Sequence, residues 1–441
     1  MPSSVPADDA LAYTWTPPIR ETITRKNELT DDADTASPKR LPVGVLGTGT
    51  PDGTKFLRDD RTWQVVSGGS GDAATPYGVV FLDDFAGAND DAKLTAALTA
   101  VAADTYPRAI QLRARQYTFN TGARAPFEGM RIMGPRGYGN PERNSQTKMP
   151  SRVHLSGFTG PWFSTSTEVF GVSLHHLSFT GGSNATILGG TGNWYCLHMR
   201  DIFSSGLRSV LGTQAQKILI TAAQFDGAWE INNCYNGAFH MGGSDNALWT
   251  DGMLLDSGPE FNTAGSANGQ YHIWFDSLEK SEVGPLYITA EGAWNGIRVS
   301  GPAYGAVASN TGSIWCHGMR VEGRNKDQPC NGSLVRVEGG FLSLRDCWLG
   351  YAMASPATPG HSPQDAGVIH HSGGGLSVTG CMYDRATGVA ETVPFVYANS
   401  SGPTRVSNQW IAGRGGTWTG LPRVQDVGSG ALTVDSSVTA I

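Results

Sequence analysis

The sequence has few charged residues and no long apolar run. Charged residues make up 16% of the 441 residues and the net charge is −7, whereas about 25% charged residues is usual in soluble domains. No stretch approaches the ~18 consecutive apolar residues of a membrane-spanning helix. The first residues, "MPSSVPADDALAYTWTPP", lack the basic and apolar segments of an export signal. We therefore expect that the chain is synthesised in a cytoplasm and does not insert into a membrane.

Patterns that would indicate nucleic acid, a metal or a cofactor are also missing. The acidic chain has no dense Lys/Arg cluster with interleaved aromatics, so we expect no nucleic-acid partner. The pairs His175-His176 and His370-His371 lack a third ligand at metal-site spacing, and adjacent side chains on a strand point to opposite sides. The Gly-rich segments do not follow a strand and open a helix, as a phosphate loop does. No metal and no cofactor is expected.

Cysteines are few, and none forms a CxxC pair. They are Cys196, Cys234, Cys316, Cys330, Cys347 and Cys381. Scattered cysteines in a chain made in a cytoplasm are expected to be reduced and mostly buried. We expect Cys347 and Cys381 to be neighbouring core thiols, and a disulfide between them is the less favoured alternative.

Glycine, by contrast, is abundant, with 58 of 441 residues, which is typical of a turn-rich β protein. Residues 1–75 have little apolar periodicity and end in "SGGSGDAATP", which predicts an attachment segment followed by a flexible linker. Residues 76–125 predict a cap made of a strand, a helix at 90–103 with an Asp pair at its start, and two short strands.

Two stretches resemble known families. The segment "GTPDGTKFLRDDRTW" (49–63) resembles the "FLRGDGTW" element of bacteriophage tail fibres. The stretch 81–120 resembles the N-terminal entry of pectate-lyase-like, right-handed parallel β-helix proteins. The residues that carry this second resemblance are Asp84, Phe85, Gly87, Ala88, Asp90, Asp91 and Tyr117.

The rest of the chain repeats, as a β-helix must, because one coil cannot bury its inner face without neighbours. An eight-residue pattern, apolar at positions one, three, six and eight, starts at Val172, Leu197, Ile218, Leu248, Ile273, Ile314, Leu342, Leu376 and, poorly, Thr404. Each copy fits two strands joined at a two-residue corner. We predict an all-β fold with a parallel β-helix at 126–420 and a C-terminal tail at 421–441. An antiparallel sandwich is the alternative, but it would not by itself repeat the same bend.

Stacking these copies turns the sequence offset into spatial adjacency at about 4.8 Å per coil. The outward second position then places Trp249, Trp274 and Trp315 near one another as an exposed aromatic stripe. A stripe of this kind suits glycan stacking or a subunit interface, and cover by a loop is a third alternative.

At the corner position the same stacking makes Asp251 and Asp276 direct neighbours. Two carboxylates about 5 Å apart suit a retaining glycosidase, and their repulsion would raise one pKa so that this group could act as a general acid. Solvated corner residues without a catalytic role are the more ordinary alternative. A lyase would need a base near an arginine, for which Arg345, Asp346 and His317 are the candidates.

The order of attachment segment, linker, cap, β-helix and tail resembles bacteriophage tail spikes and tail fibres. The resemblance implies a homotrimeric virion tail protein, made in the host cytoplasm. It also implies that residues 1–75 contact other tail or baseplate proteins and that the β-helix binds host surface polysaccharide. Two alternatives stay open: an active polysaccharide depolymerase, either a hydrolase or a lyase, and a purely structural head, tail or baseplate fibre.

Overall fold

A computed structural model describes most of the chain after residue 77. The described residues are 55–57, 63–65, 78–135, 150–213, 215–227, 229–232, 234, 237, 239–243, 247–249, 253–256, 271–278, 280–284, 286–289, 295–301, 313–322, 332–350, 367–385, 394–407, 410–413, 424–434 and 439–440. The chain divides into two units, 1–72 and 73–441. In the first unit, β1 (Lys55–Leu57) and β2 (Trp63–Val65) pair antiparallel.

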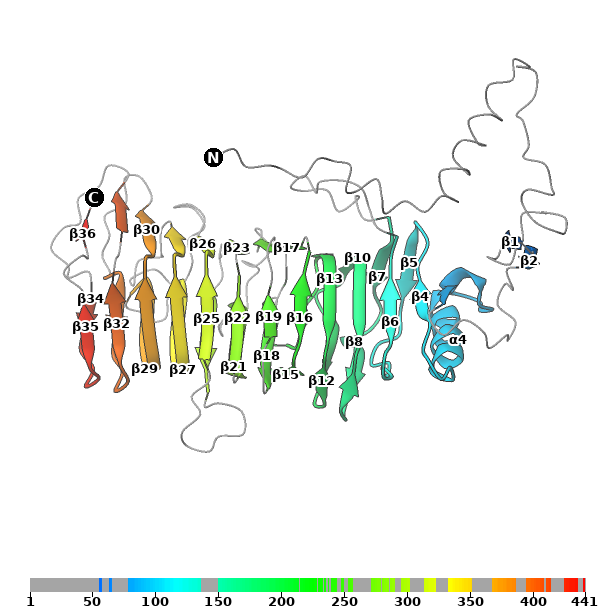
Figure 1. The fold of residues 1–441 in the computed structure, drawn as a ribbon, viewed down its shortest axis with the longest axis horizontal. Coiled ribbons are helices and arrows are strands. Elements are labelled where there is room, and N and C mark those ends of the chain that lie inside the picture. Colours follow the sequence, from blue (N-terminus) through cyan, green and yellow to red (C-terminus); the bar gives the residue numbers. More distant parts are fainter. Residues whose placement is uncertain are drawn as a thin grey trace, which may run out of the picture. The chain divides into compact units, whose positions relative to one another are not determined.

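The second unit is a parallel β-helix, as predicted. Its coils stack in a row from the N-terminal coils (cyan in Figure 1) to the C-terminal ones (red). Three parallel ladders, here named A, B and C, run along the stack through the described residues. The chain passes from C to A to B within each coil.

Ladder A consists of β3 (Val79–Phe81), β4 (Ala109–Gln111), β6 (Arg131–Met133), the first halves of β10 (Ser173–Gly181) and β13 (His198–Ser205), β16 (Gln224–Asp226), β19 (Ala247–Trp249), β22 (Lys280–Val283), β25 (Ser313–His317), the second halves of β27 (Val335–Arg345) and β29 (Ile369–Thr379), β32 (Thr404–Ser407) and β35 (Leu432–Val434). Ladder B consists of β5 (Gln116–Phe119), β7 (Arg152–Leu155), the ends of β10 and β13, β17 (Trp229–Asn232), β20 (Met253–Asp256), β23 (Leu286–Thr289), β26 (Arg320–Glu322), β28 (Trp348–Gly350), β30 (Met382–Arg385), β33 (Trp410–Gly413) and β36 (Thr439–Ala440). Ladder C consists of β8 (Gly160–Thr165), β9 (Val169–Phe170), β11 (Ala185–Gly190), β12 (Asn193–Tyr195), β14 (Ser209–Leu211), β15 (Ile218–Thr221), β18 (Phe239–Gly243), β21 (Tyr271–Leu278), β24 (Asn295–Ser300), the starts of β27 and β29, β31 (Val396–Ala398) and β34 (Val424–Asp426).

Alternating side chains on each strand fill the interior. In ladder A the inward column is Leu174, Met199, Phe225, Val283, Cys316, Leu344, Val378 and Val406, and each of these residues is at most 1% exposed. Burial of apolar surface at about 25 cal/mol per Å² is available to each coil only through its neighbours. The stack is therefore stabilised as a whole rather than coil by coil.

Ladders A and B meet at a corner formed by one residue in the left-handed conformation. The corner residues are His176, Asp201, Gly227, Gly318, Asp346 and Gly380, with φ between 51° and 77°. The left-handed region reverses the chain sharply and favours Gly, Asn and Asp over other residues. This corner is the physical form of the bend that the sequence repeat predicts.

The predicted register is confirmed for four steps and wrong for the others. Val172 to Leu197, Ile314 to Leu342, Leu342 to Leu376 and Leu376 to Thr404 are equivalent positions in successive coils. The copies at Ile218 and Ile273 belong to ladder C instead. The copy at Leu248 is shifted by one residue, because Leu248 pairs with Gln224 and Glu282 at the second position.

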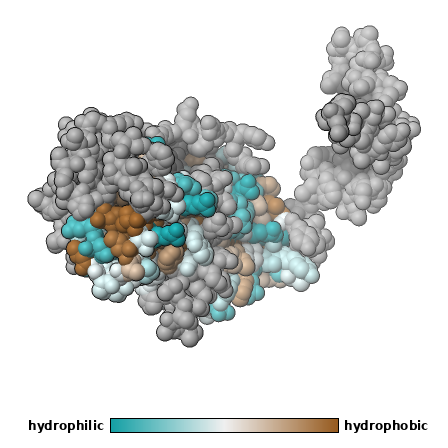
Figure 2. Space-filling view, turned by 60° about the vertical axis from the view of Figure 1, so that its left-hand side comes forward, coloured by the Kyte–Doolittle hydropathy of each residue, from teal (hydrophilic) through white to brown (hydrophobic). Residues whose placement is uncertain are grey.

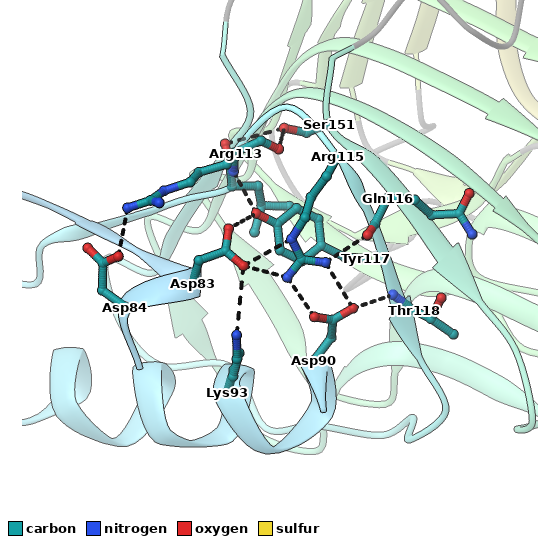
Figure 3. Close-up of polar contacts among 11 residues, drawn as sticks. Asp83, Asp84, Asp90, Lys93, Arg113, Arg115, Gln116, Tyr117, Thr118 and Ser151 are labelled. Carbon is teal, nitrogen blue, oxygen red and sulfur yellow. Dashed lines mark hydrogen bonds and ion pairs between the residues drawn. The ribbon is translucent and has the colours of Figure 1, made fainter. Parts of the chain in front are cut away.

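The predicted cap helix is confirmed as α4 (Asp90–Ala102), with the side chain of Asn89 accepting a hydrogen bond from Ala92 N at 2.9 Å. The short helix η1 (Leu82–Asp84), which precedes α4 in the chain, brings Asp83 to Arg115. Arg115 lies between Asp83 and Asp90, at 2.5 and 2.7 Å (Figure 3), while Asp90 also accepts from Thr118 N at 2.9 Å. Asp90 of the predicted entry motif therefore ties the helix to β5.

Figure 2, turned so that the C-terminal coils come forward, shows hydrophobic side chains in brown at this end. The exposed apolar residues of the last described coil are Val427, Leu432 and Val434, at 39–51% exposure. Strands β34 and β35 pair with β31 and β32, and β36 pairs with β33. Part of the predicted tail thus continues all three ladders.

Candidate functional site

The three predicted tryptophans do not form one column. Trp249 in ladder A pairs with Phe225 and Val283, both of which are buried. Trp274 lies in ladder C and Trp315 in ladder A. The predicted stripe is wrong for two reasons. The copy at Leu248 was placed one residue away from its true register, and a one-residue slip exchanges the two faces of a strand. The copy at Ile273 was placed in ladder A, whereas it belongs to ladder C.

Trp274 is held inside a stack of side chains on the outer face of ladder C. The ring of His240, on the preceding strand β18, lies parallel to the indole with centroids 3.9 Å apart and an interplanar angle of 1°. Arg298, on the following strand β24, places its guanidinium carbon 4.1 Å from the indole centroid. Because β18 and β24 flank β21 on opposite sides, both faces of the indole are covered. The indole Nε1 donates to Ser300 Oγ at 2.6 Å.

Trp315 is different, because its side chain is 46% exposed. It stands at the outward position of β25, next in register to Ser343, Ser377 and Arg405. Two small serine side chains follow the indole, and Arg405, which is exposed, comes next. At about 4.8 Å per strand, the tryptophan and the arginine are separated by roughly 14 Å. An exposed aromatic side chain next to small polar residues is suited to contact a sugar ring.

Asp276 has the opposite electrostatics from those expected of a general acid. Burial alone would raise its pKa, but a hydrogen bond with His240 and the charge of Lys217 lower that pKa to about 2. Its Oδ2 lies 3.3 Å from Lys217 Nζ and 3.4 Å from His240 Nε2. Of the two carboxyls, one of which was expected to have a raised pKa, Asp276 is therefore not the one.

Asp251, the predicted partner of Asp276, lies outside the described residues. The strands on either side of it, β19 and β20, pair with β22 and β23. Asp276 lies on β21, which pairs with β18 and β24. The register that suggested adjacency of the two carboxylates is therefore wrong.

The residues considered for a lyase lie at the corner of ladder A. His317 and Arg345 are register neighbours, and Arg345 Nε lies 3.4 Å from Asp346 Oδ2. The side chains of Arg345 and Asp346 are 75% and 68% exposed. Ion pairs this exposed contribute little stability.

An ion network that the sequence reading missed continues from Trp274 along ladder C. Arg298 binds Glu338 through two nitrogens, at 2.7 and 2.6 Å, and donates to Tyr271 Oη at 2.7 Å. Arg336, the register neighbour of Arg298, reaches the other oxygen of Glu338 at 2.7 Å. Only the correct register, with β21, β24 and β27 in one ladder, could have placed these residues together.

The cysteine prediction is confirmed for the described pair. Cys347 and Cys381 are free, buried thiols in hydrogen-bond contact with each other, and this contact, followed by burial, raises the pKa of Cys381. Within the described part of the chain, no group of three or more His, Cys, Asp or Glu side chains could hold a metal ion. No described helix is long and apolar enough to cross a membrane.

Comparisons with known proteins give no family. No family model matches the chain, and no curated protein matches it. Five chains of solved structures match. They include "ORF18" of Geobacillus virus E2, at 10% identity and a TM-score of 0.41 over 86% of this chain and 67% of that one.

A second match is the tailspike protein of Acinetobacter baumannii phage AM24, at 13% identity and a TM-score of 0.43 over 86% of this chain and 56% of that one. A third is the catalytic domain of a GH87 alpha-1,3-glucanase, at 12% identity and a TM-score of 0.29, covering 82% of this chain and 68% of that one. The chain thus spans little more than half of the AM24 protein. At these identities and TM-scores, function has to be argued from the residues themselves.

Proposed function

We propose that this chain is a virion tail protein of the tail-spike or tail-fibre kind, whose β-helix binds polysaccharide on a host cell surface. The observation that carries the proposal is Trp315, an indole 46% exposed on a strand in the middle of a rigid parallel stack. An exposed indole on a regular strand offers an aromatic surface that a sugar ring can cover.

The surroundings of Trp315 favour a sugar over an apolar partner. The next outward positions along ladder A are Ser343 and Ser377, which offer hydroxyl groups and little bulk. Arg405, at the next position, adds a charged donor. A glycan chain lying along the axis would stack one ring on the indole and reach the hydroxyls and the guanidinium with the next. Trp274 has no part in this contact, since both faces of its indole are covered.

The other parts of the proposal rest on the sequence resemblance. Residues 1–75 would bind other tail or baseplate proteins, and the chain would assemble as a homotrimer after synthesis in the host cytoplasm. A depolymerase built on Asp251 and Asp276 is disfavoured, because Asp276 lies on β21 of ladder C, whereas the strands that flank Asp251 belong to ladders A and B.

The test is binding of the purified chain to polysaccharides extracted from candidate host surfaces, compared with two matched variants. Trp315→Ala should weaken binding about tenfold or more, which corresponds to about 1.4 kcal/mol. Phe170→Ala removes an aromatic side chain of similar exposure, 42%, from ladder C and should leave binding unchanged. Equal binding by wild type and Trp315→Ala would overturn the glycan site, and a structural fibre would then be the better description.

A further inference from the structure

A chain of three titratable side chains crosses three successive coils on the outer face of ladder A. His175 Nε2 lies 3.1 Å from His198 Nδ1, and His198 Nε2 lies 3.0 Å from Asp226 Oδ1. The residues come from β10, β13 and β16, which stack in register. Regular hydrogen-bond distances at both contacts show that the three side chains form one connected unit.

The directions of these hydrogen bonds follow from the chemistry of the groups. An ionised carboxylate only accepts, so His198 must donate to Asp226 through Nε2. When both rings are neutral, Nδ1 of His198 is then an acceptor, and His175 must donate to it through Nε2. This leaves Nδ1 of His175 with its lone pair, as a hydrogen-bond acceptor. Burial first, then the neighbouring His198 and His176, lower the pKa of His175 to about 4, so this ring stays neutral near pH 7.

The neighbouring residue His176 adds a second oriented ring. Its Nδ1 lies 2.8 Å from Asp201 Oδ2, and its ring centroid is 6.0 Å from that of His175. The sequence reading placed the two rings on opposite sides of a strand. That expectation is wrong because His176 is the left-handed corner residue, with φ 56°, where the strand alternation is broken.

Arg200 supplies donors at the same place. It is the register neighbour of His175 on one side and of Asp226 on the other. Its side chain is 41% exposed and its Nε lies 3.6 Å from Asp201 Oδ2, beyond hydrogen-bond distance. That Nε has no hydrogen-bond partner among the described residues, although it is shielded from solvent. Asp201 and Asp226 already contact His176 and His198. The guanidinium of Arg200 therefore has donors left for a ligand.

We infer that His175 and Arg200 form a binding site for an acidic sugar, a uronic acid residue of a polysaccharide. The carboxylate would accept from the Arg200 fork, which suits planar carboxylates, and a ring hydroxyl would donate to His175 Nδ1. The two side chains stand one strand spacing apart, about 4.8 Å, and one sugar presents both groups on neighbouring atoms. His198 and Asp226 are positioning residues that fix the tautomer of His175.

This site deepens the proposed function and rests on it, but it lies elsewhere on the same face. Strands β13 and β25 are separated by four steps along ladder A, or roughly 19 Å at about 4.8 Å per step. One polysaccharide chain running along the axis could contact both Trp315 and Arg200. The two contacts would contribute differently, since the indole recognises a sugar face of any charge and the guanidinium recognises an acid.

The test uses two polymers that differ only in charge, polygalacturonate and its carboxyl-reduced counterpart, and measures binding by titration calorimetry to the full chain. Wild type should bind polygalacturonate more tightly than the reduced polymer by a factor of about ten or more, and tenfold corresponds to about 1.4 kcal/mol of binding free energy. Arg200→Gln should lose this preference. His175→Phe, which removes the acceptor but retains an aromatic ring, should weaken the binding of both polymers.

Arg345→Gln is the matched control. Arg345 also occupies the corner position next to a left-handed aspartate, Asp346, and a histidine is its register neighbour. That arginine lacks the oriented chain that ends at Asp226, and its variant should keep the preference for polygalacturonate. Thermal denaturation of each variant establishes that the chain is folded.

Each other outcome overturns the inference. Equal affinity of wild type for the two polymers, no binding to either, or a preference that survives in Arg200→Gln would each remove the uronate site. Equal loss in Arg200→Gln and Arg345→Gln would also remove it, since it would indicate general charge attraction. The proposed function fails separately, if neither these polymers nor any host polysaccharide binds in a Trp315-dependent way.

Discussion

The ring of His240 lies parallel to the indole of Trp274 at a centroid distance of 3.9 Å. Arg298 covers the opposite face of the same indole at 4.1 Å. Stacked in this way, Trp274 links three successive strands of ladder C on their outer side. Its size and aromatic character are therefore used for holding coils together, whereas the side chain of Trp315 is 46% exposed.

Replacing each tryptophan should separate these two roles. Trp274→Ala is expected to lower the free energy of unfolding by about 2–4 kcal/mol, in the range of large aromatic truncations in packed surroundings. Trp315→Ala should change it by no more than about 0.5 kcal/mol, as is usual for exposed positions. Denaturant unfolding monitored by circular dichroism measures both. Equal destabilisation by the two substitutions would contradict the assignment of Trp274 as structural.

Asp276 should make the protein more stable near neutral pH than in acid. Because its folded pKa is about 2 and an unfolded Asp has a pKa of about 3.9, its ionised form is favoured by folding. This contribution is complete above about pH 4 and is lost as the pH falls toward about 2.

Thermal unfolding of wild type and of Asp276→Asn is measured over this pH range, and the two stabilities are compared. At pH 7 the variant should be less stable by about 2 kcal/mol, and the gap should close as the pH falls. A gap that stays constant down to pH 2 would show that the contacts with Lys217 and His240 do not depend on the charge of Asp276.

His175 should give a pH dependence at higher pH. Its folded pKa is lowered to about 4, while an unfolded His titrates near 6.5. The unfolded chain therefore takes up a proton before the folded one does, and stability falls as the pH decreases from about 6.5 to about 4. His175→Asn should show a smaller loss of melting temperature between these pH values than wild type. His317→Asn, at an exposed position, is the control, and an equal response of both variants would argue against a partly buried neutral ring at His175.

The thiols offer a test of the core. Among the described cysteines only Cys196 is exposed, whereas Cys234, Cys316, Cys347 and Cys381 are buried. Cys196→Ser should therefore lower the number of thiols that react rapidly with a thiol reagent in the native protein by one. Cys347→Ser should leave that number unchanged, since its thiol is shielded inside the stack. Rapid reaction of Cys347 in the folded protein would contradict its place in the core.

The fold class was predictable from sequence because the bend between ladders A and B leaves a pattern of apolar spacing in every coil. The register was not, because ladders A and C have the same alternation of apolar and polar residues. "IWFDSLEK" from ladder C and "IWCHGMRV" from ladder A look like copies of one unit. Segments of unequal length join the ladders, so distance along the chain does not tell one ladder from another.

Predicting the residues of the candidate site required the correct register, whereas predicting the fold class did not. Trp315 kept its predicted outward position, since its neighbouring copies at Leu342 and Leu376 were correctly aligned. The pairing of Asp251 with Asp276 failed with the misplaced copy at Ile273. His198 and Asp226 were missed as a unit because the copy at Ile218 displaced Asp226 from its column beside Arg200.

The corner between ladders A and B gives a last prediction, about glycine. Gly227 has φ 77°, which residues with a Cβ adopt only at a cost. A Cβ built on it would also lie 2.2 Å from Asp201 Oδ1. Gly227→Ala should therefore destabilise the protein by more than about 1 kcal/mol and should displace Asp201 from His176.

Ala222 is the matched position at the corner before ladder A, with φ 54° and a side chain already in place. Ala222→Gly should relieve this backbone strain and leave stability equal or raised by up to about 1 kcal/mol. Thermal unfolding of both variants measures the difference. If Gly227→Ala were as stable as wild type, the close approach of Asp201 to the next coil would be wrong, and with it the orientation of His176 beside the proposed uronate site.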